Sequence, residues 1–261
     1  MSESNEGGNA RRRAPGRASV KAIISDIHSN FEALQAVLKD IEKHPVTDIY
    51  CLGDVIGYGP HPNECCALIR ERTSLCLSGN HDLAVVGGLD VSDFSGDAAV
   101  AVRWTQDVLE AGHADWLRSL APRAEREGVQ LFHGSPRDPV WDYVLTFEAV
   151  DATFELTEEP LVLVGHSHVP LALASADGAL GGGLAPEGTE VELAADARLI
   201  LNPGSVGQPR DGDPRAAWLL LDFDAGRASF RRVEYPVVRT QEEIRERGLP
   251  DSLAGRLAGG V

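Results

Sequence analysis

Three segments near the start of the chain decide the fold: VKAIISDIHSN at residues 20–30, DIYCLGDV at 48–55 and SLCLSGNHD at 74–82. Each begins with a short apolar run that predicts a buried strand. A helix is predicted between each strand and the next, because apolar residues recur at helical spacing between the first two. This alternation predicts parallel strands joined by right-handed crossovers, so the chain is expected to open with a βαβαβ unit.

The rest of the chain continues with helices and strands. The expected elements are helices over 96–111, 114–120 and 146–156, and strands over 129–132 and 161–164. Residues 171–201 predict short strands broken by the cluster Gly181-Gly182-Gly183. A β-hairpin is expected over 217–235, turning at Asp224-Ala225-Gly226. The capping-box pair Thr240 and Glu243 predicts the start of a final helix.

The domain organisation is expected to be simple. Residues 20–261 contain no internal repeat and no linker, which predicts a single α/β domain. Residues 1–19 are rich in Gly, Ser, Asn and Arg and predict a disordered tail. A small basic docking segment is the alternative, because Arg11–Arg13 stand together there.

Composition excludes some classes of function. The chain of 261 residues carries a net charge of −16, which disfavours wrapping of a nucleic-acid polymer. It contains no run of about 20 apolar residues, so no membrane partner is expected. No apolar segment follows the N-terminal arginines, which disfavours a secretory signal. The four cysteines match no zinc spacing or disulfide framework, and a reducing cytoplasm suits them.

The polar clusters of the sequence follow predicted strands. They are Asp26-Ile27-His28, Gly53-Asp54, Gly79-Asn80-His81-Asp82, His133-Gly134 and Gly165-His166-Ser167-His168. In open α/β sheets, ligands bind beyond the carboxyl ends of the strands. Five of the eight histidines stand at these strand ends, which favours one metal site with nitrogen and oxygen ligands. Asn80 has an alternative role as the cap of a turn.

The spacing within two clusters is also informative. Residues i and i+2 of an extended segment point the same way. On this basis Asp26 and His28 are expected to bind one ion together, and so are His166 and His168.

The motifs D-x-H, G-D, G-N-H-D, H-G and G-H-x-H occur here in the order typical of the calcineurin-like metallophosphoesterases, which the chain resembles from about Val20 to its end. The strings SDIHSN, CLGDVIGYGP, LFHGSPRDP, VGHSHVP and NPGSVGQPRDGDPRA make it similar to the small bacterial phosphodiesterase branch. The fold that this resemblance implies is a four-layer αββα sandwich of two mixed β-sheets flanked by helices.

The resemblance also implies roles for individual residues. The first divalent metal would be held by Asp26, His28 and His168. The second would be held by Asn80, His133 and His166. Asp54 would bridge both metals, His81 would face the leaving-group oxygen, and Asp82 would orient His81.

The chemistry expected of such a site is phosphoester hydrolysis. Two divalent ions roughly 3.5–4 Å apart clamp the attacking and leaving oxygens, and a hydroxide that bridges them attacks phosphorus. His81 would stabilise charge or donate a proton if protonated, and would only hydrogen-bond if neutral. The ligand set suits Mn²⁺, Fe and Zn²⁺ alike.

Three residues are candidates for substrate binding. Protein phosphatases and symmetrical dinucleoside tetraphosphatases carry an Arg in the string G-D-x-x-D-R-G, whereas Tyr58 stands at that place here. Arg210 is expected either to replace that positive charge or to pair with an Asp in a surface loop. Trp141 is expected either to stack on a base or to pack in the core.

Two classes of function follow from these patterns. The first is a phosphoesterase acting on small phosphodiesters, with phosphomonoesters and dinucleoside polyphosphates as alternatives. The second is a non-catalytic scaffold, as some proteins of this fold are, including a retromer subunit. Those proteins have lost the histidine of G-N-H-D or some ligands, whereas this chain has the full set. The oligomeric state is not predicted.

Overall fold

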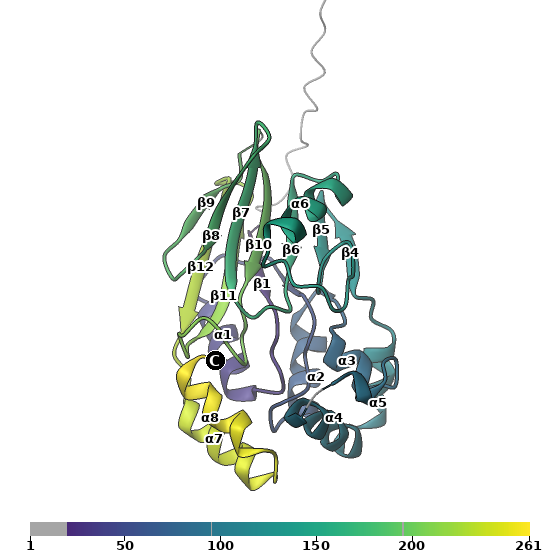
Figure 1. The fold of residues 1–261 in the computed structure, drawn as a ribbon. Coiled ribbons are helices and arrows are strands. Elements are labelled where there is room, and N and C mark those ends of the chain that lie inside the picture. Colours follow the sequence, from purple (N-terminus) through teal and green to yellow (C-terminus); the bar gives the residue numbers. More distant parts are fainter. Residues whose placement is uncertain (1–19, 95, 195) are drawn as a thin grey trace, which may run out of the picture.

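The computed structural model describes residues 20–94, 96–194 and 196–261. The tail predicted over residues 1–19 lies outside the described residues. Two six-stranded sheets pack face to face in this part of the chain (Figure 1). The first has the order β3 (Leu75–Cys76), β2 (Asp48–Cys51), β1 (Val20–Ile24), β11 (Ala216–Asp222), β12 (Arg227–Val233) and β9 (Glu190–Glu192). The second has the order β4 (Arg123–Arg126), β5 (Val129–Phe132), β6 (Leu161–Val164), β10 (Arg198–Pro203), β7 (Pro170–Ala176) and β8 (Ala179–Leu184).

Both sheets are mixed. Strand β1 pairs with β2 in parallel, and β2 pairs with β3 in parallel, which confirms the predicted opening unit. On its other side β1 pairs with β11 in the antiparallel sense, and the hairpin of β11 and β12 is confirmed. In the second sheet β5, β6 and β10 run parallel, while β4, β7 and β8 are antiparallel to their neighbours.

Strand β1 shows why these runs are mostly apolar, with Lys21 as its one charged residue. Successive side chains of a strand point to opposite faces of the sheet. Ile23 packs into the core between the two sheets, whereas Ala22 and Ile24 pack into the core under the helices. All three side chains are fully buried, because both faces of the strand are covered.

Helices complete the outer layers. The helices of the chain are α1 (Phe31–Ile41), α2 (Pro62–Arg72), α3 (Asn80–Val85), α4 (Gly96–Val108), α5 (Ala111–Arg118), α6 (Phe147–Leu156), α7 (Val237–Glu246) and α8 (Asp251–Gly259), with a 3-10 turn, η1, at Val91–Asp93. Leu34 of α1 and Ile69 of α2 pack with Ile24 against the first sheet. Phe154 of α6 packs with Val162 against the second. The predicted four-layer αββα fold is confirmed.

One expectation about the elements was wrong, and one strand was missed. Gly181-Gly182-Gly183 lie inside β8 and pair with residues 172–174 of β7, so they do not break the strand. The charged strand β4 was not expected. It is a short edge strand whose side chains are largely exposed, so it lacks the apolar pattern that predicts strands. Strand β9 falls within residues 171–201, where short strands were predicted.

The end of the chain also differs from its prediction. Thr240 does not begin a helix, because α7 starts at Val237 and a second helix, α8, follows it. The Thr240 hydroxyl donates to Asn30 Oδ1 at 3.2 Å instead of capping its own helix. Both helices lie at one end of the molecule, beside the chain terminus (Figure 1). None of the helices in the described residues is long and apolar enough to cross a membrane.

Candidate metal centre

Six of the seven predicted ligands lie on loops that follow the carboxyl ends of β1, β2, β5 and β6, and Asn80 is the first residue of α3, which follows β3. These loops are not extended. Nine non-glycine residues with positive φ occur in the described part of the chain, and five of them are predicted ligands: Asp26, His28, Asp54, His166 and His168. Such a backbone costs of order 1–3 kcal/mol per residue, and it tends to concentrate at functional sites. The i, i+2 argument from extended geometry was therefore wrong in its premise.

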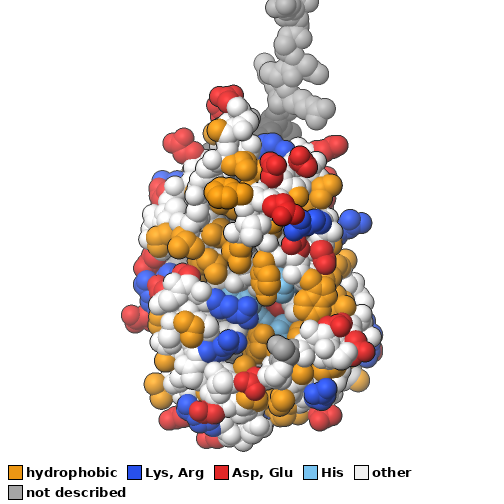
Figure 2. Space-filling view, viewed as in Figure 1, with side chains coloured by type: hydrophobic (Ala, Val, Ile, Leu, Met, Phe, Trp, Pro, Cys, Tyr) orange, Lys and Arg blue, Asp and Glu red, His pale blue; other side chains and the backbone are white. Residues whose placement is uncertain are grey.

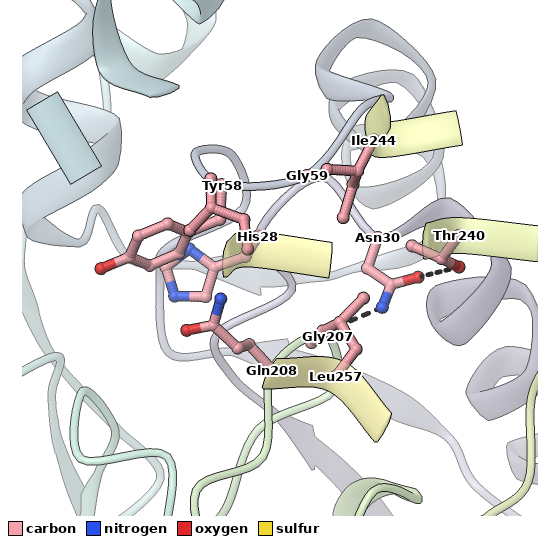
Figure 3. Close-up of a pocket in the computed structure, with 10 residues that line it drawn as sticks. His28, Asn30, Tyr58, Gly59, Gly207, Gln208, Thr240, Ile244 and Leu257 are labelled. Carbon is pink, nitrogen blue, oxygen red and sulfur yellow. Dashed lines mark hydrogen bonds between the residues drawn. The ribbon is translucent and has the colours of Figure 1, made fainter. Parts of the chain in front are cut away.

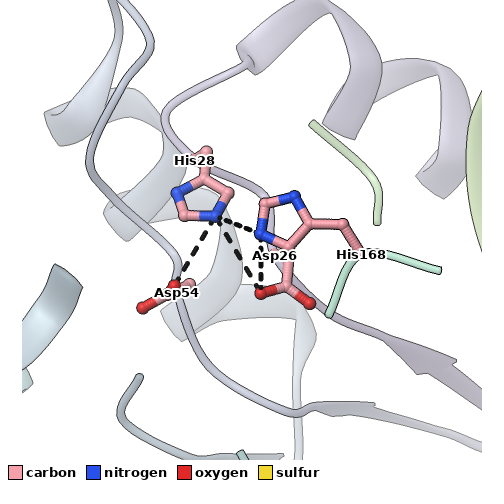
Figure 4. Close-up of side chains that lie close together, drawn as sticks. All are labelled: Asp26, His28, Asp54 and His168. Carbon is pink, nitrogen blue, oxygen red and sulfur yellow. Dashed lines mark hydrogen bonds and ion pairs between the residues drawn. The ribbon is translucent and has the colours of Figure 1, made fainter. Parts of the chain in front are cut away.

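A first cluster joins Asp26, His28, Asp54 and His168, all of them buried (Figure 4). The Nε2 atoms of His28 and His168 are 3.0 Å apart. His28 Nε2 lies 3.5 Å from Asp54 Oδ2, and His168 Nε2 lies 3.4 Å from Asp26 Oδ1. Four nitrogen and oxygen atoms thus converge on one small volume.

A second cluster joins Asp54, His133 and His166, with Asn80 beside them. His133 Nε2 lies 3.6 Å from Asp54 Oδ2, 3.3 Å from Asn80 Oδ1 and 3.2 Å from His166 Nδ1. Asp54 Oδ2 therefore faces both clusters. His166 and His168 belong to different clusters, so the expectation that they bind one ion together was wrong.

Backbone carbonyls orient three of the histidines. The Nδ1 atoms of His28, His133 and His168 lie 3.2, 2.9 and 2.6 Å from the carbonyl oxygens of Ile56, Leu52 and Gln208. A carbonyl oxygen only accepts hydrogen bonds, so each Nδ1 carries the proton. Each Nε2 then presents a lone pair to the cluster, as metal-binding histidines held by a second hydrogen bond do.

The two clusters have the chemistry of cation sites. The lone pairs of His28 Nε2 and His168 Nε2 face each other at 3.0 Å, which is repulsive without a cation between them. Asp26 Oδ1 and Asp54 Oδ2 are buried and have no hydrogen-bond partner in the described part of the chain. Leaving such atoms unpaired is costly, and bound divalent cations would satisfy them. The residues present therefore fit a pair of metal ions.

A cavity of about 170 Å³ opens onto the clusters, and Figure 2 shows histidines in a hollow of this face. The predicted substrate residues Tyr58, Trp141 and Arg210 line it, with Asn80, His81 and His166. Arg210 does not pair with a neighbouring aspartate, because Asp213 binds Arg215 and Asp211 binds Arg232. Its Nη2 donates instead to Gln208 Oε1 at 3.0 Å.

Sequence reasoning missed some residues of the cavity wall. Asp93 and Phe94 line it from the segment between α3 and α4, and Ala98 lines it from the first turn of α4. Nothing in their sequence context distinguishes them from ordinary loop or helix residues. The ring of Tyr143, one of the residues near His133, stacks on the His166 ring at 4.2 Å between centroids.

The comparison with known families decides the assignment. Residues 21–226 match the calcineurin-like phosphoesterase superfamily domain. The chain belongs to the calcineurin-like phosphoesterase superfamily. The predicted resemblance is confirmed, and the metal-suited clusters lie within the matched residues.

Individual relatives of this phosphoesterase agree with the match. An uncharacterized protein of Methanocaldococcus jannaschii is 40% identical over 245 residues, covering 92% of this chain and 97% of that protein. A metallophosphoesterase from Sphaerobacter thermophilus has a TM-score of 0.84 and 42% identity, covering 94% of this chain and 100% of that one. A symmetrical bis(5'-nucleosyl)-tetraphosphatase of Actinobacillus pleuropneumoniae is 26% identical over 141 residues, which are 52% of this chain and 47% of that protein.

Hydrogen bonds of the Asn30 side chain fix the loop that carries His28 (Figure 3). Asn30 caps α1 by accepting from the Ala33 N–H at 3.2 Å. Its side-chain amide donates to the Gly207 carbonyl at 2.8 Å, and its Oδ1 also accepts from Thr240 of α7. One asparagine therefore ties the first metal-binding loop of the phosphoesterase to the segment before Arg210 and to the C-terminal helices.

Burial sets the protonation of the metal-free clusters. It raises the pKa of Asp26 to about 7 and raises the pKa of Asp54 well above its usual value. Burial also lowers the pKa of His166 to about 2 and the pKa values of His28 and His168 well below normal. The imidazoles of His28, His166 and His168 therefore stay neutral at neutral pH, whereas Asp26 is partly protonated.

Metal affinity is expected to fall as the pH drops below about 7. Asp26 and Asp54 bind a cation only when ionised, so a metal in the first cluster must displace any protons that burial retains on these two carboxylates. His28 and His168 do not compete for protons there, because their pKa values are lowered. A loss of about tenfold per pH unit is expected for each displaced proton. Calorimetric titration with Mn²⁺ between about pH 5.5 and about pH 8 measures it, and a constant affinity over that range would contradict it.

His81 lines the cavity and is a member of neither ligand cluster. Its ring lines the cavity, 4.3 Å from the Tyr58 ring and 5.0 Å from the Phe94 ring between centroids. Burial lowers the pKa of His81 to about 3, so the ring is neutral at neutral pH. Of the two roles considered from sequence, hydrogen bonding by a neutral imidazole is the one favoured.

Asp82 does not orient His81, contrary to the prediction. Its carboxylate accepts from the backbone N–H groups of Val55, Ile56 and Gly79 at 3.2, 3.1 and 3.0 Å. The Nδ1 of His81 has no hydrogen-bond partner in the described residues. Asp82 instead joins the loop after Asp54 to the start of α3, and so positions the backbone of both motifs.

Asp82→Ala is expected to lower the free energy of unfolding of the metal-free protein by about 3–5 kcal/mol, because three buried N–H groups lose their acceptor. Denaturant unfolding measures the change. The exposed Asp107 of α4 offers a control, since Asp107→Ala removes a carboxylate without a buried contact. Equal stability of the two variants would contradict the assigned role.

Proposed function

We propose that this chain is a dinuclear-metal phosphodiesterase that hydrolyses small phosphodiesters. The observation that carries the proposal is that Asp54 Oδ2 faces both ligand clusters at the base of one cavity. The first ion would be held by Asp26, His28 and His168, the second by Asn80, His133 and His166, and Asp54 would contact both. Mn²⁺, Fe and Zn²⁺ fit this ligand set.

The bound ions would acidify a water nucleophile and offset the charge of the phosphate. The chain's own residues would do the rest. Arg210 is the one arginine among the residues that line the cavity of about 170 Å³, and none of the others is a lysine. Its guanidinium would bind a non-bridging phosphate oxygen. His81 would donate a hydrogen bond to the leaving oxygen. Tyr58 and Phe94 hold the His81 ring between them, which limits its orientation.

The preference for diesters rests on charge. A phosphodiester carries one negative charge, whereas a monoester dianion carries two. The superfamily branches with an Arg after the second motif have a further cation there, and Tyr58 replaces it in this chain. One arginine beside the metals therefore suits the singly charged group better. Trp141 and Tyr143 form an aromatic wall on which a base could stack.

Dinucleoside polyphosphates are the second candidate substrate. They are favoured by the similarity over about half of the chain to a symmetrical bis(5'-nucleosyl)-tetraphosphatase. Phosphomonoesters remain a third. A scaffold function is disfavoured, because every predicted ligand and His81 surround the cavity or the clusters. The free cysteines Cys51, Cys65, Cys66 and Cys76 suit the proposed cytoplasmic location.

Metal analysis and a substrate screen test the proposal together. The chain is reconstituted with Mn²⁺, Fe²⁺ or Zn²⁺, its metal content is measured, and it is assayed on bis-p-nitrophenyl phosphate, p-nitrophenyl phosphate, cyclic nucleotides and diadenosine tetraphosphate. We expect two ions per chain and faster turnover of diesters. Faster monoester turnover would overturn the diester preference, and neither metal nor turnover would support a scaffold.

A further inference from the structure

A second cavity, of about 800 Å³, adjoins the catalytic one. The two cavities share Tyr58, Ala98 and Arg210 in their walls. The rest of the second wall comes mainly from α8 and the start of α4. A substrate held at the metal clusters can therefore extend over Arg210 toward the C-terminal helix.

Two arginines meet at the junction of these cavities. Arg210 Nη2 and Arg256 Nη1 lie 3.0 and 3.3 Å from the same atom, Gln208 Oε1. Two guanidinium groups thus share a single neutral acceptor, which leaves most of their hydrogen-bond donors unused. The Nε of Arg210 is buried and has no hydrogen-bond partner in the described residues.

Neither arginine forms a salt bridge within the described part of the chain, although the protein carries 40 acidic residues against 24 basic ones. Other arginines of the same region are neutralised, as Arg215 is by Asp213. Asp97 is the acidic side chain among the residues lining the larger cavity, and it accepts a hydrogen bond from Ser252. Figure 2 shows basic side chains gathered at one side of the hollow that contains the histidines.

We propose that Arg256 binds a second phosphate group of the substrate, next to the one that is hydrolysed, and that Arg210 lies between the two phosphates and contacts both. Two like charges held close together are stabilised by an anion between them. Arginine binds phosphate oxygens through paired N–H donors, and these two side chains have such donors free. Among the candidate substrates named above, this arrangement favours compounds with two or more linked phosphates, such as dinucleoside polyphosphates, over diesters with a single phosphate.

This inference rests on the proposed function, because it extends the same site. Arg256 lies beyond residue 226, where the match to the superfamily domain ends. It is thus a feature of this chain's C-terminal helix and not of the shared metal-binding motifs. Its role would be substrate selection, since it stands outside both ligand clusters.

Arg256→Gln tests the proposal in the full, metal-loaded chain. The probes are bis-p-nitrophenyl phosphate, which has one phosphate, and ADP and diadenosine tetraphosphate, which have linked phosphates. Mn²⁺ is kept in constant excess. ADP is measured as an inhibitor of bis-p-nitrophenyl phosphate hydrolysis, so the readout does not require that it be hydrolysed. A matched control is Arg247→Gln, which removes one charge from the same C-terminal segment at an exposed position.

We expect Arg256→Gln to weaken ADP inhibition and to raise the KM for diadenosine tetraphosphate by about tenfold to a hundredfold, the usual loss for a hydrogen bond to a charged group. The change in KM for bis-p-nitrophenyl phosphate should be at least about tenfold smaller, and Arg247→Gln should match the wild type. Equal losses on all probes would overturn the inference, because they would place the effect at the metals. No loss on any probe would overturn it as well. A wild-type chain without turnover of bis-p-nitrophenyl phosphate would instead refute the proposed function.

Discussion

Asp54→Asn is expected to abolish binding of both metals and to reduce phosphoesterase turnover by about three orders of magnitude or more, which is about 4 kcal/mol of activation free energy. The reason lies in the two oxygens of Asp54. Oδ1 accepts a hydrogen bond from the backbone N–H of His81 at 2.9 Å, whereas Oδ2 faces both clusters. An asparagine that keeps the first contact must turn its NH₂ group toward the metals. A donor group then replaces the shared ligand.

The same substitution should not harm the metal-free fold. Burial raises the pKa of Asp54 well above its usual value, so the metal-free protein carries an unfavourable buried carboxyl there. A neutral amide of similar shape should leave the thermal midpoint of the metal-free protein unchanged or higher. Metal content, turnover and thermal unfolding are measured in parallel, with Asp107→Asn as the exposed control. Two ions retained with normal turnover would show that Asp54 does not bridge the metals.

His81→Ala is expected to keep both ions and to lose turnover by a factor of about 10²–10³, the usual loss when one hydrogen-bond donor to a developing negative charge is removed. His81 stands in the cavity wall and is a member of neither ligand cluster. The loss should be larger for an alkyl diester than for a p-nitrophenyl ester, because an alkoxide leaving group needs more help than p-nitrophenolate.

His81→Gln serves as the companion variant, because glutamine retains a hydrogen-bond donor of similar reach. We expect it to recover part of the turnover that alanine loses. Metal analysis of both variants separates chemistry from binding. Unchanged kcat for His81→Ala would contradict the role assigned to this side chain, and loss of a metal would mean that the side chain supports a ligand.

Much of the site was readable because parallel strands place their carboxyl ends at one edge of a sheet. Asp26 and Asp54 follow neighbouring parallel strands of the first sheet, so their convergence follows from the strand order, whereas His133 follows β5 of the second sheet and reaches them only because the two sheets pack together. The strand order does not predict which ligand belongs to which of the two clusters. His166 and His168 have φ values of 63° and 60°, and this left-handed backbone sends their rings to different clusters.

Other features depend on contacts between distant segments, which local patterns do not carry. Asp82 follows His81 in the chain, yet its carboxylate faces the backbone of residues 55 and 56. Phe94 reaches the cavity only because α3 and α4 fold beside it. Edge strands such as β4 are exposed and charged, so they lack the apolar periodicity by which strands are recognised.

Strand β1 is paired with β2 on one side and with β11 on the other, and the residues of these two partners are separated by most of the chain. During synthesis the N-terminal strands leave the ribosome first, and structure forms as partners become available. Asp26 and His28 therefore lack their neighbour His168 until that residue has been synthesised. Strand β1 likewise lacks its second partner until residues 219–222 have been synthesised. The metal centre can thus be completed only late in synthesis or after release. The ions would then bind a nearly finished fold, and a truncated chain that ends before β11 would contain every proposed ligand but lack the strand that pairs with β1, which leads into Asp26 and His28.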